Sequence, residues 1–175
     1  MKKSFVFWQV VGFVFVSVAG TLLHFLYDWT NQSTFVGLFS AVNESIWEHM
    51  KLLFVPMVAF AVAEKFLLKR NIEHFWCIKL FGILAGLTVI PVLYYTYTGI
   101  LGISADWFNI TIFFIAAAVG FLVECAIFKN HKCRLSDLVA LSVIGFIGFA
   151  FLVFTFSPPE IPLCQDPLTK TFGIQ

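Results

Sequence analysis

Residues 5–27, FVFWQVVGFVFVSVAGTLLHFLY, form an apolar stretch as long as the helix that crosses a lipid bilayer. A bilayer core takes roughly 20 helical residues, because each residue advances the helix by about 1.5 Å. Four later stretches have the same character, namely 47–68, 75–97, 107–128 and 135–156. The sequence therefore predicts an all-α polytopic membrane protein. We expect a bundle of five transmembrane helices within residues 1–157, followed by an external C-terminal tail, 158–175.

The overall composition agrees with this fold class. The chain is 60% hydrophobic and only 12% charged, with 23 Phe among 175 residues, whereas soluble domains are about a quarter charged. Its formal net charge is +1, and no basic patch or stripe stands out. Nucleic-acid binding needs such a basic surface. The expected partner is therefore the lipid bilayer, and no nucleic acid is expected.

Two segments outside the predicted spans carry structural signals. Residues 33–42, STFVGLFSAV, are too few to span and too apolar for an ordinary loop, so we expect an interfacial or re-entrant half-helix before the second span. Pro158 and Pro159 stop the last helix, since proline cannot continue one. The apolar side chains of the tail favour docking back onto the helix ends, where Asp166 would join a polar pocket.

The basic residues predict the orientation of the chain. Cytoplasmic connections carry an excess of Lys and Arg. If the five spans alternate, nine of the eleven basic residues fall on one side: Lys2, Lys3, Lys65, Lys69, Arg70, Lys79, Lys129, Lys132 and Arg134. We therefore expect a cytoplasmic N-terminus and an external C-terminus. A signal peptide cleaved after Ser17-x-Ala19 is the alternative, but the apolar run continues to Leu26.

The expected redox state of the cysteines follows from this orientation. Cys77, Cys125 and Cys133 fall at or near the cytoplasmic side, where thiols stay reduced, and Cys164 is alone outside. The sequence therefore predicts no internal disulfide, and it contains no C-x-x-C metal spacing.

A polar segment interrupts this apolar chain at residues 43–51, NESIWEHMK, at the external end of the second span. On the first span, Gly20, His24 and Asp28 share one helical face that ends at the same level. Asp106 and Asn109 begin the fourth span on that side. The candidate ligand-binding residues are His24, Asp28, Asn43, Glu44, Glu48, His49 and Lys51.

A purely structural interpretation of this segment competes with a functional one. Ser45-x-x-Glu48 has the form of a capping box, and Glu48 with Lys51 could be a surface ion pair. Capping does not explain His49, nor His24 and Asp28 on the first span. Ionisable groups inside a membrane are costly, which favours a functional site.

Metal binding is one chemistry that these residue types support. Catalytic zinc commonly takes two His and one carboxylate and keeps a fourth position open. The candidate metal ligands are His24, Asp28, Glu48 and His49, and the candidate catalytic residues are Glu44, Glu48 and His49. A divalent metal is thus the candidate cofactor. Because the chain has no H-E-x-x-H motif, the sequence leaves open whether the protein is an enzyme.

Other features within the spans are read as packing. Gly82-x-x-x-Gly86 and Ala116-x-x-x-Gly120 are small-residue patterns that let helices approach closely. Glu64 and Glu124 lie near the inner ends of the second and fourth spans, and together with the outer acids they suggest a proton-coupled small transporter as a further alternative. The structural interpretation pairs Glu64 with Lys65 or Lys69, and Glu124 with Lys129 or Arg134.

Three segments together resemble one known family. They are GTLLHFLYDW at 20–29, FSAVNESIWEHMKLLFVPM at 39–57 and PPEIPLCQDPLTKTFGI at 158–174. In these the chain is similar to DUF6512, an uncharacterised family of small bacterial integral membrane proteins. The resemblance implies a five-helix protein of the bacterial plasma membrane with no assigned activity. The matching positions are Asn43, Glu44, Ser45, Trp47, Glu48, His49 and Lys51, with His24 and Asp166.

Three functional hypotheses follow. The first is a binding or accessory membrane protein whose external pocket holds a cation, a lipid headgroup or a small polar ligand. The second is a membrane-embedded metal-dependent hydrolase or transferase that uses the same cluster. The third is the proton-coupled transporter.

Overall fold

The structure, a computed structural model, describes residues 2–68, 72–130 and 133–174. Over these residues the regular structure is helical, and the tail adds one isolated bridge between Gln165 and Phe172. The six helices are α1 (Lys2–Trp29), α2 (Thr34–Gly37), α3 (Ile46–Leu68), α4 (Phe75–Leu101), α5 (Asp106–Asn130) and α6 (Asp137–Phe156). The all-helical fold class is confirmed.

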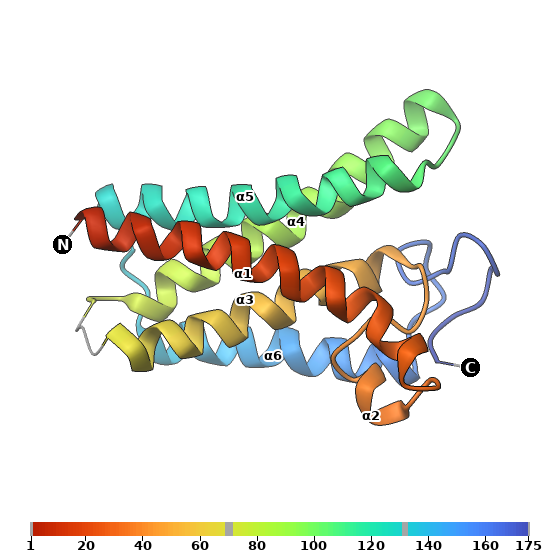
Figure 1. Cartoon of the computed structure of the whole chain (residues 1–175), viewed down its shortest axis with the longest axis horizontal. Coiled ribbons are helices and arrows are strands. Elements are labelled where there is room, and N and C mark those ends of the chain that lie inside the picture. The colour runs from red at the N-terminus through yellow and green to blue at the C-terminus, as the bar shows by residue number, and fades with distance from the viewer. Residues whose placement is uncertain (1, 69–71, 131–132, 175) are drawn as a thin grey trace.

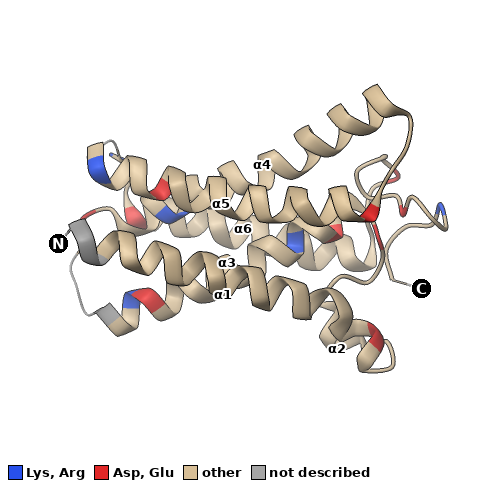
Figure 2. Ribbon diagram, turned by 45° about the horizontal axis from the view of Figure 1, so that its top comes forward, with Lys and Arg blue, Asp and Glu red and all other residues tan. Residues whose placement is uncertain are grey.

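The five long helices run alternately in opposite directions (Figure 1). The starts of α1, α4 and α6 therefore lie at the same end as the last turns of α3 and α5. Basic side chains gather toward this end (Figure 2), which we call the basic end. The opposite end holds residues 43–51 and the tail, and we call it the motif end. Helix α3 is central, because it contacts α1, α4, α5 and α6.

Among the residues that the structure describes, four helices are long and apolar enough to cross a membrane. They include residues 5–29 of α1 together with all of α4, α5 and α6. The predicted second span, α3, is not among the four. It carries Glu48, Lys51 and Glu64, all buried against the helices around it. Four spans are thus supported by length and composition, and the fifth stays a prediction. The predicted half-helix over 33–42 is shorter than expected, since only α2 is helical there.

Small residues bring α4 and α5 into close contact, as the two predicted patterns require. A Cβ added to Gly82 would lie 2.9 Å from the backbone oxygen of Gly120, and one added to Gly86 would lie 3.1 Å from that of Ala116. The two patterns therefore face each other across one interface. This interface fixes the direction in which the motif end of α5 projects.

A buried ion cluster joins three helices near the basic end. Lys79 Nζ of α4 lies 2.5 Å from Glu64 Oε2 of α3 and 2.5 Å from Glu124 Oε2 of α5. All three side chains are at most 2% exposed. The predicted pairings of these acids with nearby basic residues are therefore wrong, because the helix crossing brings in Lys79 from a different helix. Lys79 is also buried rather than a surface charge of the connection.

A disulfide contradicts the sequence prediction for the cysteines. Cys77 in the first turn of α4 is bonded to Cys133, which follows α5, with the two Cα atoms 6.1 Å apart. The prediction considered only the expected compartment of each thiol. It could not foresee that the chain returns from α5 to the start of α4. Cys125 and Cys164 are free.

Candidate functional site

The motif segment is built as a loop that leads into a capped helix. Ser45 precedes α3, and its Oγ accepts a hydrogen bond from the Glu48 N–H at 3.3 Å. Half of the predicted capping box is thus present. The other half is replaced, since the Ser45 N–H donates to Asn43 Oδ1 at 3.0 Å rather than to Glu48. Glu48 is therefore free for a different contact.

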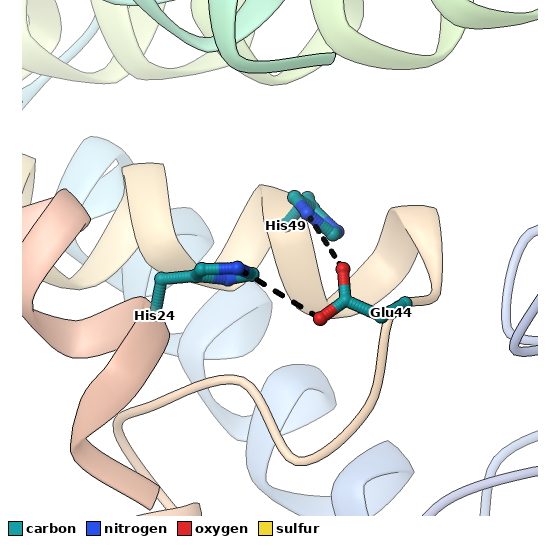
Figure 3. Close-up of side chains that lie close together, drawn as sticks. All are labelled: His24, Glu44 and His49. Carbon is teal, nitrogen blue, oxygen red and sulfur yellow. Dashed lines mark ion pairs between the residues drawn. The ribbon is translucent and has the colours of Figure 1, made fainter. Parts of the chain in front are cut away.

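Three ionisable side chains meet beside this helix start. Glu44 points from the loop toward His24 of α1 and His49 of α3 (Figure 3). Its Oε1 lies 3.8 Å from His24 Nε2, and its Oε2 lies 3.6 Å from His49 Nε2. The two imidazole rings have centroids 5.4 Å apart. The structure therefore brings together His24 and His49, which are 25 positions apart in the chain.

The second nitrogen of His49 is engaged by the backbone. Nδ1 lies 2.9 Å from the carbonyl oxygen of Ser45. A carbonyl oxygen only accepts, so Nδ1 carries a proton, and in the neutral imidazole the lone pair is then on Nε2, the nitrogen nearest to Glu44. Metal-binding histidines are commonly oriented by such a bond. The Nδ1 of His24, by contrast, is buried and has no hydrogen-bond partner within the described part of the chain.

The spacing of these groups fits a small metal ion. One ligand atom from each of His24, Glu44 and His49 can be chosen so that all three lie within 4.8 Å of one another. In a tetrahedral zinc site with bonds of about 2.0–2.1 Å, neighbouring ligand atoms lie about 3.3 Å apart. Small rotations of half-exposed side chains bridge the difference.

A cavity opens directly beside the three side chains. Its larger lobe has a volume of about 410 Å³ and lies between α1 and α5, and its smaller lobe has about 160 Å³. Both lobes are lined by Glu44, His49, Asp106 and Asn109, with Leu168 of the tail at the edge. The larger lobe is in the size range of small-molecule sites. The polar start of α5 thus faces the histidine–glutamate cluster, as its position in the sequence suggested.

Glu48 and Lys51 form a separate buried group. Lys51 Nζ lies 2.6 Å from Glu48 Oε2 and donates to Thr155 Oγ1 of α6 at 2.9 Å. It also donates to the carbonyl of Gly37 in α2 at 2.8 Å. The Lys51 side chain is 0% exposed and that of Glu48 is 2% exposed, so the predicted surface pair is wrong. Because these groups satisfy each other away from the cavity, they tie α2 and α6 to α3.

The remaining predicted residues also fall outside the three-residue cluster. Asn43 Nδ2 donates to the carbonyl of Gly173 at 3.0 Å. Asp28, one helical turn beyond His24, is exposed and is not part of the group that could hold a metal ion. The structure thus separates the seven predicted residues into a cluster of three, a buried pair, a tail contact and an exposed acid.

The tail docks on the motif segment, as its apolar residues suggested. Asp166 Oδ2 accepts from the Glu44 N–H at 3.4 Å, and the Trp47 N–H donates to the carbonyl of Leu163 at 3.0 Å. Asp166 therefore positions the backbone of Glu44 rather than joining the cavity as a further acid. In this tail, burial and then the nearby Glu48 carboxylate raise the pKa of the Cys164 thiol to about 11.

Sequence reasoning did not identify Thr155 or Gly37, which both accept hydrogen bonds from the buried Lys51 ammonium. The only sequence signal for Thr155 is that it is a polar residue in the last turn of α6, after an uninterrupted run of apolar residues and glycines from Val143 to Phe154. Leu168 was expected to dock, but its place at the cavity edge depends on the path of the tail.

The fold and composition define an all-helical protein with several helices suited to a membrane. The chain belongs to DUF6512, a family of unknown function whose model matches residues 1–174. This match confirms the resemblance noted from the sequence. No curated protein and no solved structure matches the chain.

Proposed function

We propose that this protein is a multi-pass membrane protein that binds a divalent transition-metal ion at the motif end, through His24, Glu44 and His49. The observation that carries the proposal is that one ligand atom from each residue lies within 4.8 Å of the others. Two imidazoles and one carboxylate suit zinc and its neighbours in the first transition series, rather than calcium or magnesium, which prefer oxygen ligands.

The origin of the three side chains in separate elements adds to the case for a metal. The three residues come from α1, the motif loop and α3, and Asp166 and Ser45 hold two of them in place. Ordering side chains from separate elements costs conformational entropy, and a bound ion compensates that cost. The buried Nδ1 of His24 lacks a hydrogen-bond partner, so this imidazole can turn at no loss of an existing bond.

For the membrane topology we propose five spans in the bacterial plasma membrane, with α3 as the second. The positive-inside rule favours a cytoplasmic position for the basic end, and the alternation of the five long helices is compatible with that orientation. The metal site and the tail would then be external. Glu64 and Glu124 are both paired with Lys79, which favours a structural role for them over proton-coupled transport.

Metal analysis of the purified protein tests the proposal. Protein expressed in zinc-supplemented medium and purified without chelator is expected to contain stoichiometric zinc by elemental mass spectrometry. Loss of a hydrogen-bond partner of a metal ligand typically lowers metal affinity about 10–100-fold, so His24→Ala and Glu44→Gln, which remove the ligands themselves, should lose the ion entirely in the same procedure.

Asp28→Asn is the matched control, because Asp28 lies one turn from His24 on the same helix but outside the cluster. It is expected to retain the wild-type zinc content. Wild-type protein that binds no transition metal, or an equal loss in Asp28→Asn and His24→Ala, would contradict the proposal.

A metal-dependent hydrolase or transferase is the second candidate, favoured by the cavity beside the proposed ligands. Three protein ligands and an open position are typical of catalytic zinc rather than structural zinc. Asp106 lines both lobes, so under this hypothesis it would be the carboxylate available as a general base, while the ion would supply Lewis-acid activation of water. Under this hypothesis Asp106→Asn keeps the zinc but abolishes zinc-dependent hydrolysis of a lipid or ester substrate. An activity that survives this variant would remove Asp106 from the mechanism.

A further inference from the structure

The larger lobe of the cavity has walls of two kinds. At one end lie the polar groups Glu44, His49, Asp106 and Asn109. Apart from Thr21 and His24, the rest of the wall is apolar and includes Phe25, Ile110 and Phe114, which are 45%, 59% and 37% exposed. These three side chains belong to α1 and α5, two of the helices suited to span a membrane. Their exposed surfaces would face acyl chains, so the lobe opens toward the lipid as well as toward the polar end.

The depth of the lobe is limited by a close helix contact. A Cβ added to Gly20 would lie 2.3 Å from Cζ of Phe113, so the Phe113 ring closes directly over this part of α1. An occupant that enters between α1 and α5 therefore has room only for its polar end and the adjoining part of its chain. This shape suits an amphiphile, with its polar group at the cluster and its chain leading back into the bilayer.

The charges in the cavity specify the polar group. A divalent ion carries two positive charges, Glu44 and Asp106 carry one negative charge each, and neutral histidines add none. Within the described residues, Asp106 has no ion-pair partner. A ligand that places a phosphate on the metal and an ammonium beside Asp106 leaves the cavity neutral. An anionic lipid would leave Asp106 unpaired and add an uncompensated charge.

We infer that the cavity binds a phospholipid with a primary ammonium headgroup, of the phosphatidylethanolamine class. Its phosphate occupies the open position of the metal, its ammonium pairs with Asp106, and the start of one acyl chain lies between α1 and α5. The inference rests on the proposed metal site, because without the ion the phosphate would meet two carboxylates.

Photocrosslinking with two lipid probes tests the inference. The protein is placed in phosphatidylcholine nanodiscs that contain either phosphatidylethanolamine or phosphatidylglycerol, each with a diazirine near the glycerol end of one chain. Labelled peptides are mapped by mass spectrometry with zinc present and after chelation. The expected result is zinc-dependent labelling of cavity-lining positions in residues 20–25 and 106–114, stronger for the ethanolamine probe.

Two variants separate specific binding from contact with bulk lipid. Ile110→Trp fills the opening and should abolish the zinc-dependent labelling. Ile115→Trp is its matched control, since Ile115 is also exposed on α5 but does not line the cavity, and it should label like wild type. Asp106→Asn should lower the preference for the ethanolamine probe about two- to five-fold, the value of a partly exposed ion pair.

Zinc content is measured on the same samples, so that the two proposals can fail separately. Labelling that ignores zinc, that survives Ile110→Trp, or that is at least as strong with phosphatidylglycerol overturns the lipid inference. If the protein holds zinc but shows no zinc-dependent labelling, only the lipid inference fails. If it holds no zinc, both proposals fall.

Discussion

Within the motif, neighbouring residues have separate roles because of helical phase. Successive side chains on a helix point about 100° apart, so Glu48 and His49 face different surroundings. Glu48 turns inward to Lys51, whereas His49 turns toward α1 and Glu44. This difference of face could be predicted from the sequence. Glu44, however, lies in the loop before α3, where no helical period applies, so its place between the two histidines could not be predicted.

Because Glu48 and Glu44 have these separate roles, we expect the same substitution to reduce stability at Glu48 and to remove zinc binding at Glu44. Glu48→Gln leaves the buried Lys51 ammonium without a negative partner and should destabilise the fold by about 3–5 kcal/mol. Glu44→Gln alters a half-exposed side chain and should change stability by at most about 0.5 kcal/mol, while it abolishes zinc binding. Thermal unfolding of the zinc-free protein in detergent measures both. A similar loss of stability in the two variants would show that the cluster and the buried pair are one unit.

The Cys164 thiol provides a pH-dependent prediction at the same scale. With its pKa raised to about 11, the thiol stays protonated at neutral pH, and only the thiolate reacts with alkylating agents. Alkylation by iodoacetamide, followed at this residue by mass spectrometry, should be slow at pH 7.5 and rise about tenfold per pH unit until the pKa is reached. Protein unfolded in dodecyl sulfate is the control and should react readily. Equal rates in folded and unfolded protein at pH 7.5 would contradict the docked position of the tail.

At the scale of the helices, the close-packed faces of α4 and α5 could be predicted from the sequence better than the ion pairs and the disulfide that join separate helices. The small residues of α4 and α5 were identified from their four-residue spacing, because this periodicity is local and marks one face of a helix. The partner of Glu64 and Glu124 was missed, because Lys79 reaches them only through the crossing of α3, α4 and α5. The disulfide was missed for the same reason.

Two glycine substitutions test the contact between α4 and α5. In Gly82→Ala the new methyl group would lie 2.4 Å from Cγ of Glu124 and 2.9 Å from the Gly120 backbone oxygen. Overpacking of this kind typically costs about 1–3 kcal/mol. Gly145→Ala on α6 is the control, since nothing lies within 4 Å of its added Cβ, and alanine there should gain up to about 1 kcal/mol in helix propensity. Unfolding midpoints in detergent should therefore move in opposite directions. Equal midpoints for Gly82→Ala and wild type would place the interface elsewhere.

For the whole molecule, the sequence predicted the helical bundle well because apolar length is a strong signal for helices in a membrane. It was less decisive for α3, whose buried charges lower the apolar character of a helix that lies at the centre of the bundle. Two whole-molecule signals also disagree about orientation. The basic residues place the basic end in the cytoplasm, whereas the Cys77–Cys133 bond at that end is of a kind that persists in oxidising compartments. The charge rule depends on many residues, so we retain the cytoplasmic orientation of the basic end.

Labelling in intact cells decides the orientation. Glu160 in the tail is exposed, so Glu160→Cys is expected to react with a membrane-impermeant maleimide added outside the cell, whereas buried Cys164 in the wild-type protein is not. Under the proposed orientation the basic end faces the reducing cytoplasm, so Cys77 and Cys133, which are bonded in the structure, are expected to be reduced in growing cells and to form their bond on oxidation. A permeant maleimide added before lysis should then block both thiols, while the impermeant reagent should not. A tail cysteine that is protected from outside, together with a closed Cys77–Cys133 bond in intact cells, would reverse the orientation and place the proposed metal site in the cytoplasm.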